Sequence, residues 1–481
     1  MTIKPQYSFD GDQVFVIDQY NDAAPFASFL PGIAGVTGIP AWVFYVNRGQ
    51  AIASFGVRNK DGAMLEFFPA DKAYQLTASR GFRTFLKISD GVNIVTHEPF
   101  QRGAGQGVRQ RLYVSPHEMG VEEIHPSLGL AIRADLFTLP EASLAGLVRR
   151  VTVQNISQQS KTVEIVDGLP QVLPYGLNQW CVKFMSRTVE AYMVVEGVLD
   201  NCPYFRLKVL PTDTPLVEPV VAGNFFVGFL NGQRNPVLVD AEKIFGMAGD
   251  FSHPERFYAS EPLDFGKQVS GNRTPSTFQA LKLELGPGES QVFYGLYGHV
   301  SSWSLLQAFL ADIKDGQYFE DKREENRRLV EGITRRAYTA TAYPLFDAYA
   351  KQCYLDNGMR GGFSMKVPGG KHLYLFGRKH GDLERDYNDF LLQDSPFSEG
   401  NGDFRDVLQN RRMDLFFDPE LDAKNIHYFF NLIQPDGYNP TALRNTRFVV
   451  EASAFSHYTG RFAGLDAVLS RPFKYAELWL V

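Results

Sequence analysis

The sequence predicts a multidomain protein in which a large antiparallel β-sandwich precedes a helical part. Three observations predict this fold class. The chain has 481 residues, too many for one ordinary core, so roughly two to four domains are expected. Residues 1–300 contain about a dozen or more strand-like segments bounded by turn residues. Near Ser301 the apolar pattern changes to helical spacing.

The strand-like segments are of two kinds. Residues 41–46 form a continuous apolar and aromatic run, which is typical of a strand buried on both faces. Residues 205–210 and 281–285 alternate between apolar and polar side chains, as in a strand with one buried face. Residues 151–155 and 161–166 also alternate, and the short polar stretch between them predicts a β-hairpin.

A helical linker follows the strands. Ser302 is expected to cap a helix over residues 303–313, and residues 320–333 carry a narrow apolar stripe on a charged, solvated helix. The chain therefore divides into a β-sandwich at residues 1–300, a helical linker at 301–343 and a helical domain at 344–481.

The last part alternates short helices with long charged loops. Helices are expected over residues 344–354, ending before Asn357, and over residues 404–417. A further helix is expected from Pro419, behind an Asp418 cap, to Ile433. Long charged loops between short helices are typical of a helical barrel whose loops form a site.

Composition excludes several classes of function. The net charge is −6 and no long basic run occurs, so nucleic acid and anionic membranes are not expected partners. The cysteines Cys181, Cys202 and Cys353 are few, odd in number and widely spaced, which predicts neither a disulfide framework nor a cysteine metal site. No apolar run reaches the ~18 residues of a membrane helix, and no signal core is recognisable. A reducing cytoplasm is the expected location.

Two motifs are set aside. Residues 103–107 superficially match a glycine-rich dinucleotide loop, but residues 109–114 read as a strand where that motif requires a helix. His372 and His380 lie eight positions apart without a suitably placed third ligand, so no metal site is expected.

The most informative region is polar, rich in aromatics and interrupted by glycines. It covers residues 375–390 and 400–412 and mixes acids, bases, amides and rings. A neutral sugar is held by such a mixture, and glycosyl chemistry adds carboxyl groups to it. Its acids allow two interpretations, general acid–base catalysis or salt bridges to neighbouring basic residues. The acids are Asp382, Glu384, Asp386 and Asp389, and the basic residues are Arg378, Lys379 and Arg385.

A second cluster lies at an expected helix start. Gln409 follows Arg405 by four positions and Asp406 by three, so the three residues share one helix face. An aspartate beside an arginine can hold adjacent sugar hydroxyls bidentately. A helix-capping salt bridge is the alternative interpretation.

At these residues the chain resembles the inverting glycoside phosphorylases of the cellobiose phosphorylase superfamily, and most of all their large β-glucan and oligoglucan phosphorylases. The resemblance spans almost the whole chain. Its most specific segments are residues 28–35 (SFLPGIAG), 38–49 (GIPAWVFYVNRG), 380–388 (HGDLERDYN) and 400–412 (GNGDFRDVLQNRR). It implies an N-terminal β-sandwich (a supersandwich), a helical linker, an (α/α)6 barrel and a small C-terminal β-domain. This chain would hold only the first part of that barrel.

The resemblance also implies a site and a reaction. Arg405, Asp406 and Gln409 match an Arg-Asp-x-x-Gln-Asp element that grips the glucosyl unit, whereas Asn410 replaces its last Asp. The matching segment before it adds three binding candidates, His380, Asp382 and Arg385. The implied reaction converts a β-linked glucoside or oligoglucan and phosphate to α-glucose 1-phosphate and a shortened sugar. Phosphate is a co-substrate, no cofactor is needed, and a homodimer is expected.

The general acid of that superfamily lies well downstream of the Arg-Asp-x-x-Gln element. It is therefore expected beyond Val481, and the catalytic residue is unknown within this chain. Asp389 belongs to a similar Asp-Tyr-Asn-Asp stretch, but this stretch precedes Arg405, which makes it a weak candidate. The chain is thus expected to be the N-terminal part of a longer or split enzyme, with an open barrel that exposes apolar faces.

Two other functions stay open. One is a carbohydrate-binding protein that kept the sandwich and lost the chemistry. The other is an inverting glycoside hydrolase, which needs a second carboxylate to activate water. Phosphate dependence of cleavage separates a phosphorylase from a hydrolase. The sequence does not specify whether a β-1,2, β-1,3 or β-1,4 linkage is used.

Overall fold

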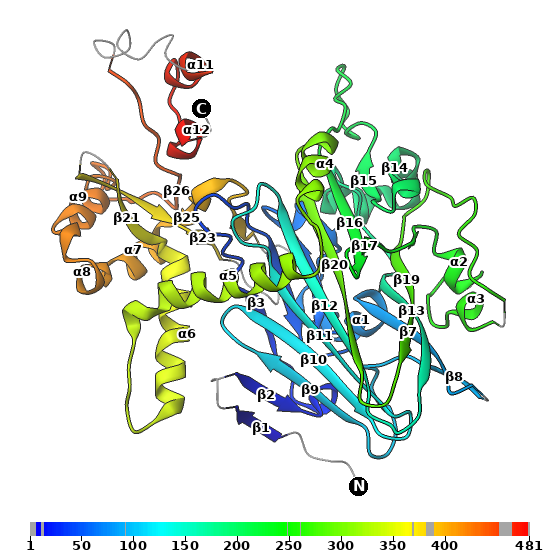
Figure 1. Cartoon of the computed structure of the whole chain (residues 1–481). Helices are drawn as coiled ribbons and strands as arrows, with labels where there is room; N and C mark the ends of the chain where they lie inside the picture. The colour runs from blue at the N-terminus through cyan, green and yellow to red at the C-terminus, as the bar shows by residue number, and fades with distance from the viewer. Residues whose placement is uncertain are drawn as a thin grey trace. The chain divides into compact units, whose positions relative to one another are not determined.

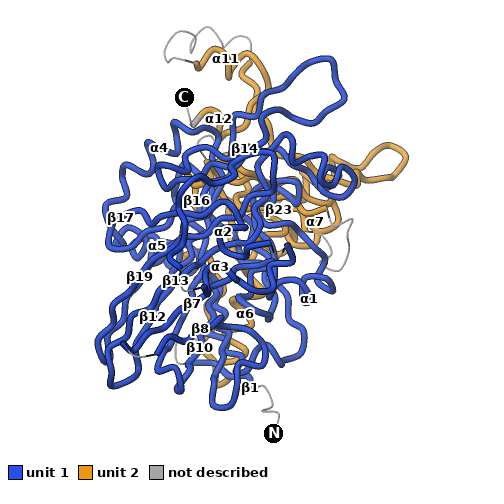
Figure 2. The backbone as a smooth tube through the Cα atoms, turned by 90° about the vertical axis from the view of Figure 1, so that its right-hand side faces the viewer, with its two compact units in different colours: residues 1–34, 41–331, 382–388 blue, residues 35–40, 332–381, 389–481 orange. Residues whose placement is uncertain are grey.

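The computed structural model forms two compact units (Figure 2). Unit 1 comprises residues 1–34, 41–331 and 382–388, and unit 2 comprises residues 35–40, 332–381 and 389–481. The structure describes residues 6–10, 14–91, 93–247, 249–259, 261–367, 370–380, 389–451 and 464–479.

Unit 1 is built on antiparallel sheets, the largest of which has eleven strands (Figure 1). Its order is β1-β2-β9-β10-β11-β12-β20-β16-β15-β14, with β17 paired to β16. The strands are β1 (Gln6–Phe9), β2 (Phe15–Asp18), β9 (Arg109–Val114), β10 (Glu118–His125), β11 (Leu130–Thr138), β12 (Ala145–Asn155), β14 (Met193–Glu196), β15 (Tyr204–Leu207), β16 (Gly223–Leu230), β17 (Gln233–Arg234) and β20 (Ser290–Val300).

Two smaller sheets complete the described β-structure of unit 1. One has five strands in the order β18-β19-β13-β7-β8, and the other has four in the order β3-β4-β5-β6. The strands of the first are β7 (Arg83–Ser89), β8 (Ile94–His97), β13 (Lys161–Leu169), β18 (Val237–Leu238) and β19 (Thr277–Leu285). Those of the second are β3 (Ala27–Leu30), β4 (Trp42–Val46), β5 (Ile52–Gly56) and β6 (Ala63–Leu65).

One large apolar cluster joins the three sheets. It includes Val43 and Phe55 from the four-stranded sheet, Val163 from the five-stranded sheet, and Leu112 and Phe293 from the eleven-stranded sheet. All of β4 is buried, as predicted for residues 41–46. The sheets therefore pack on one another around a shared core, which confirms a large antiparallel assembly in the first part of the chain.

A buried ion pair also connects two of these sheets. Arg149 on β12 and Asp167 on β13 are both fully buried, and Arg149 Nη2 lies 2.8 Å from Asp167 Oδ1. Thr84 Oγ1 donates a further hydrogen bond to the same carboxylate oxygen at 2.6 Å. Because the two strands belong to different sheets, this pair fixes how the layers meet in the interior.

The predicted hairpin at residues 151–166 is wrong, although both strands exist. Strand β12 pairs with β11 and β20, whereas β13 pairs with β7 and β19 in the other sheet. The amide of Asn155 explains the crossing, because its Nδ2 donates to the carbonyl oxygens of Gln159 and Leu285 at 2.7 and 3.1 Å. These bonds hold the connecting loop in a path from one sheet to the other.

The helices of unit 1 include the two expected near its end. Helix α4 (Trp303–Ala311) begins behind Ser302, whose Oγ accepts from the amide of Leu305 at 3.3 Å, which confirms the cap. Helix α5 (Gln317–Thr334) follows. The other helical segments of unit 1 are η1 (Tyr20–Asp22), η2 (Lys60–Gly62), α1 (Ala70–Arg80), η3 (Cys181–Met185), η4 (Ser186–Tyr192), η5 (Val198–Asp200), α2 (Glu242–Phe245) and α3 (Glu255–Tyr258).

Unit 2 combines helices with three two-stranded sheets in its described part. Its helical segments are η6 (Arg335–Ala337), α6 (Pro344–Gly361), η8 (Pro396–Ser398), α7 (Phe404–Arg411), α8 (Asp414–Phe417), η9 (Pro419–Leu421), α9 (Lys424–Phe430), α11 (Leu465–Leu469) and α12 (Tyr475–Trp479). Its paired strands are β21 (Phe363–Val367) with β22 (Lys371–Leu375), β23 (Arg378–Lys379) with β24 (Leu391–Leu392), and β25 (Gly402–Asp403) with β26 (Ala442–Leu443).

Three helices of unit 2 differ from the sequence prediction. The helix expected over residues 404–417 forms as two, α7 and α8. Helix α6 continues through Asn357 and Gly358 to Gly361. A Cβ on Gly358 would lie 2.3 Å from the ring of Phe363, so this glycine allows close packing and does not end the helix. The helix expected over residues 419–433 is broken, because Asp422 has a φ of 45° between η9 and α9.

Many large apolar side chains of unit 2 are exposed. They include Tyr343, Leu345, Phe416, Ile426 and Phe430. The (α/α)6 barrel and the sequence-derived boundaries at residues 300 and 343 stay predictions. Within the described residues, no helix combines the length and apolar character needed to cross a bilayer.

Candidate functional site

A cavity of about 820 Å³ lies within unit 2. Its walls come from α6, α7, α8 and the segment over residues 336–339. This volume falls in the range typical of small-molecule sites, roughly 300–1,000 Å³.

Helix α7 contributes three of the residues singled out in the sequence. Asp406, Gln409 and Asn410 line the cavity together, and the spacing of three positions predicts this shared face for Asp406 and Gln409. Asn410 Nδ2 donates to the carbonyl oxygen of Asp406 at 2.7 Å. The opposite face of α7 is anchored by Phe404 and Val407, which are buried in an apolar cluster of unit 2. The helix therefore presents its polar face to the cavity.

Arg405 does not join this group. Its side chain is 89% exposed, and its Nε lies 3.6 Å from Asp406 Oδ1. The single helix face predicted for Arg405, Asp406 and Gln409 is therefore wrong for Arg405, because adjacent positions on a helix point about 100° apart. The contact between Arg405 and Asp406 lies on the surface, and it is not the helix-capping salt bridge of the alternative interpretation, because α7 begins behind Asp403 without a side-chain cap.

The other walls supply charged groups and rings. On α6, Arg360 Nη2 lies 3.2 Å from Asp356 Oδ2, and both residues line the cavity. Tyr354 and Phe417 contribute rings whose centroids are 4.8 Å apart. Tyr338, another lining residue, is exposed. The cavity thus pairs carboxylates and amides with flat apolar surfaces.

A carboxyl group that the sequence analysis missed also lines this cavity. Burial raises the pKa of Asp414 to about 6, although Arg411 opposes that shift. Asn425 Nδ2 donates to Asp414 Oδ2 at 3.4 Å. A group with this pKa keeps a protonated fraction near neutral pH and can donate a proton. The only signal in the sequence was its position eight residues after Asp406, two helical turns farther along.

The remaining predicted site residues do not add to this cavity within the described part of the chain. His380 does not line the cavity, and burial together with Arg378 lowers its pKa to about 2, so its ring is neutral. Asp382 and Arg385 lie outside the described residues, as do Glu384 and Asp386. Asp389 has a 75% exposed side chain and lies 2.7 Å from Lys379 Nζ, which is the salt-bridge interpretation of this acid.

A small polar cavity of about 30 Å³, also in unit 2, contains the second unusual carboxyl group. Glu399 is 7% exposed, and neither of its carboxylate oxygens has a hydrogen-bond partner within the described residues. Burial raises its pKa to about 7, while Lys474 and Arg411 oppose the shift. Arg411 is held in place by Tyr374, whose ring centroid is 3.3 Å from its Cζ, and by the carbonyl oxygen of Gly361.

Glu399 is expected to make the protein less stable as pH rises. Its folded-state pKa is raised from 4.5 to about 7, so the folded state binds the proton more tightly than the unfolded state. The stabilisation is complete below pH 4.5 and is lost as pH rises through about 7. Glu399→Gln should therefore be more stable by about 3 kcal/mol above pH 7 and should flatten the pH dependence.

Urea unfolding at about pH 5 and about pH 8 measures this effect. Glu451→Gln, which changes an exposed glutamate of unit 2, is the matched control. An unchanged pH slope in Glu399→Gln would show that the buried carboxyl is not linked to stability.

Gly400 is expected to tolerate no side chain. A Cβ at this position would lie 1.8 Å from the carbonyl oxygen of Gly377, which is backbone and cannot rotate away. Gly400→Ala should cost roughly 1–3 kcal/mol or more in unfolding free energy. Gly332→Ala is the control, because nothing lies within 4 Å of its Cβ position and an added methyl in a helix is favourable. Equal denaturation midpoints for the two variants would contradict the close approach of Gly400 to the Gly377 backbone.

Metal binding has little support here. In the described ranges, no group of three or more His, Cys, Asp or Glu side chains is arranged to hold a metal ion.

Comparisons with known proteins give distant likenesses only. No family model matches the chain, and no curated protein matches its sequence. Among solved structures, a bacterial glucoamylase complexed with acarbose superposes with a TM-score of 0.39 at 9% identity, over 87% of this chain and 51% of the other. A human-microbiome protein described as a kojibiose phosphorylase gives 0.36 at 8% identity, over 89% and 44%. A polysaccharide lyase gives 0.31 at 12% identity, over 57% and 34%.

The chain therefore spans about half or less of the lengths of these three structures. All three TM-scores lie below 0.5, so family and function rest on the residues of this chain.

Proposed function

We propose that the unit 2 cavity binds the glucosyl unit of a β-linked glucoside or oligoglucan. We further propose that the chain functions in an inverting glycoside phosphorylase. The observation that supports this proposal is the convergence of Asp406, Gln409 and Asn410 with Tyr354 and Phe417 around one cavity of about 820 Å³. Sugars are bound by such combinations, in which polar side chains fix the hydroxyls and rings cover the apolar face.

Each residue type has a distinct part in this proposal. The Asp406 carboxylate accepts hydrogen bonds from two adjacent hydroxyls, and Gln409 both donates to and accepts from the next one. The Asn410 side chain is held by the backbone carbonyl oxygen of Asp406, one turn earlier on α7. Tyr354 and Phe417 form the apolar surface beneath the sugar ring.

Asp414 is the acid of this cavity best suited to donate a proton. Its pKa of about 6 leaves part of the population protonated near neutral pH. In an inverting phosphorylase, one acid protonates the leaving oxygen and phosphate attacks the anomeric carbon from the opposite face, which yields α-glucose 1-phosphate. Phosphate is then the co-substrate and no cofactor takes part.

An inverting hydrolase is the second candidate, and one observation favours it. The same cavity holds three carboxyl groups, those of Asp356, Asp406 and Asp414. A hydrolase needs an acid and a second carboxylate that activates water, whereas a phosphorylase needs only the acid.

Cleavage of β-linked glucose oligosaccharides with and without inorganic phosphate tests both candidates. A phosphorylase releases α-glucose 1-phosphate only when phosphate is present. Phosphate-independent release of glucose would identify a hydrolase. Sugar binding without turnover under either condition would leave a carbohydrate-binding protein.

A further inference from the structure

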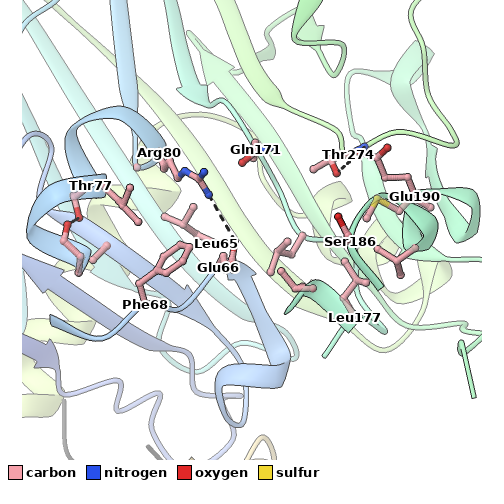
Figure 3. Close-up of a pocket in the computed structure, with 18 of the residues that line it drawn as sticks. Leu65, Glu66, Phe68, Thr77, Arg80, Gln171, Leu177, Ser186, Glu190 and Thr274 are labelled. Atoms are coloured by element: carbon pink, nitrogen blue, oxygen red, sulfur yellow. Dashed lines mark hydrogen bonds and ion pairs between the residues drawn. The ribbon is translucent and has the colours of Figure 1, made fainter. Parts of the chain in front are cut away.

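Unit 1 contains a second cavity, with a volume of about 360 Å³. Figure 3 shows Glu66 and Arg80 on one side of it, Ser186 and Glu190 on the other, and Gln171 between the two groups in this view. One wall is built from α1 and the segment after β6, and the opposite wall from the π-helical turn η3 and the adjoining η4. None of these residues belongs to the site proposed in unit 2.

The polar groups of this cavity are only partly used by the protein itself. Glu190 is fixed, because the backbone amide and Oγ1 of Thr274 donate to its Oε1 at 3.1 and 2.8 Å. Glu66 lies 4.0 Å from Arg80 Nη1 and is only partly exposed. Within the part of the chain that the structure describes, neither the Gln171 amide nor the Ser186 hydroxyl makes a hydrogen bond. Several donors and acceptors are thus available to a ligand.

The charges of this cavity cancel. Its carboxylates are Glu66 and Glu190, and its guanidinium groups are Arg80 and Arg187. Each carboxylate has an arginine beside it, at 4.0 Å for Glu66 and 3.6 Å for Glu190. A strongly charged ligand would face a like charge near either pair, whereas an uncharged ligand with several hydroxyl groups can use both acceptors and donors.

Apolar side chains complete the lining. Leu76 and Phe68 come from the α1 side, and Leu173 and Val189 come from the other walls. The same segment that forms the η3 wall also exposes an aromatic pair, Trp180 and Phe184, with ring centroids 6.0 Å apart. A pyranose ring has an apolar C–H face, which these side chains can contact, and hydroxyl groups, which the unused donors and acceptors can bind.

We propose that this unit 1 cavity is a separate binding site for a neutral polyhydroxylated ligand of one or two sugar rings. Gln171 and Glu66 hold the hydroxyl groups, and Leu76 contacts the apolar face of the ring. Of its two carboxylates, Glu190 is held through Oε1 by Thr274 and does not face a free partner. Its role is therefore binding, not catalysis, and it does not depend on the function proposed for unit 2.

Hydrogen exchange followed by mass spectrometry tests the proposal on the whole chain. Glucose and cellobiose are the neutral probes, glucosamine is the cationic probe and glucuronate is the anionic probe. The neutral sugars should protect residues 181–193, which form the η3–η4 wall. Gln171→Ala should weaken that protection by about tenfold in Kd, and Leu76→Trp, which fills the cavity, should abolish it.

Residues 404–417 report on the unit 2 cavity in the same experiment, so the two sites succeed or fail separately. Gln409→Ala should leave the protection of residues 181–193 unchanged. The proposal is overturned if neither neutral sugar protects residues 181–193, if protection persists in both Gln171→Ala and Leu76→Trp, or if a charged probe protects better than the neutral ones. Because Gln171 is only partly buried, its variant keeps the test informative even if Leu76→Trp does not fold.

Discussion

Asp167→Asn is expected to lower the free energy of unfolding by about 3 kcal/mol or more. The carboxylate of Asp167 is fully buried and lies against Arg149, which is also fully buried. Removing its charge leaves the guanidinium of Arg149 in the interior without a counter-charge, although Gln50 Oε1 and Thr84 Oγ1 still accept hydrogen bonds from it. Desolvation of an unpaired cation is the dominant cost. Urea denaturation measures the change.

Glu164→Gln is the matched control for this prediction. Glu164 lies on the same strand, β13, and pairs with Lys87 at 3.1 Å, but its side chain is 46% exposed. Water screens that pair, so its loss should cost at most about 0.5 kcal/mol. Similar losses in the two variants would contradict the view that the buried pair holds the sheets together.

Asp406→Asn is expected to weaken sugar binding in unit 2 by roughly 10- to 100-fold in Kd. The substitution keeps the shape of the side chain but removes the charge that strengthens hydrogen bonds to sugar hydroxyls, each worth roughly 1.5–3 kcal/mol. The affinity is obtained from a cellobiose titration that follows protection of residues 404–417 against hydrogen exchange.

Asp422→Asn provides the control for Asp406→Asn. Asp422 is exposed in the same unit, does not line the cavity, and has a φ of 45° that asparagine also adopts readily. Its variant should bind as the parent does. Equal weakening in both variants would point to a general loss of charge and not to a contact in the cavity.

Local features of the fold were predictable from sequence, whereas strand partners were not. The buried run at residues 42–46 and the Ser302 cap depend on neighbouring residues, and both are confirmed. The hairpin predicted at residues 151–166 is wrong because each strand pairs with strands that are distant in sequence. Asn155 holds the connecting loop through a hydrogen bond to the carbonyl oxygen of Leu285. The predicted end of α6 was also wrong, because Gly358 lies inside the helix, where its missing side chain leaves room for the ring of Phe363.

In the candidate site, too, local sequence features could be predicted and effects of the folded structure could not. Helical spacing predicted one face for Arg405, Asp406 and Gln409, and of these Asp406 and Gln409 line the cavity, together with Asn410, whereas Arg405 does not. The raised pKa values of Glu399 and Asp414 come from burial in the folded protein, which no sequence pattern indicates.

A crystal structure of the chain grown with sophorose, laminaribiose or cellobiose tests the central claim most directly, because these disaccharides carry the β-1,2, β-1,3 and β-1,4 linkages. The account predicts a glucosyl ring in the unit 2 cavity, with hydroxyl groups within hydrogen-bond distance of Asp406 and Gln409. A unit 2 cavity that stays empty with all three disaccharides at saturating concentration would contradict it.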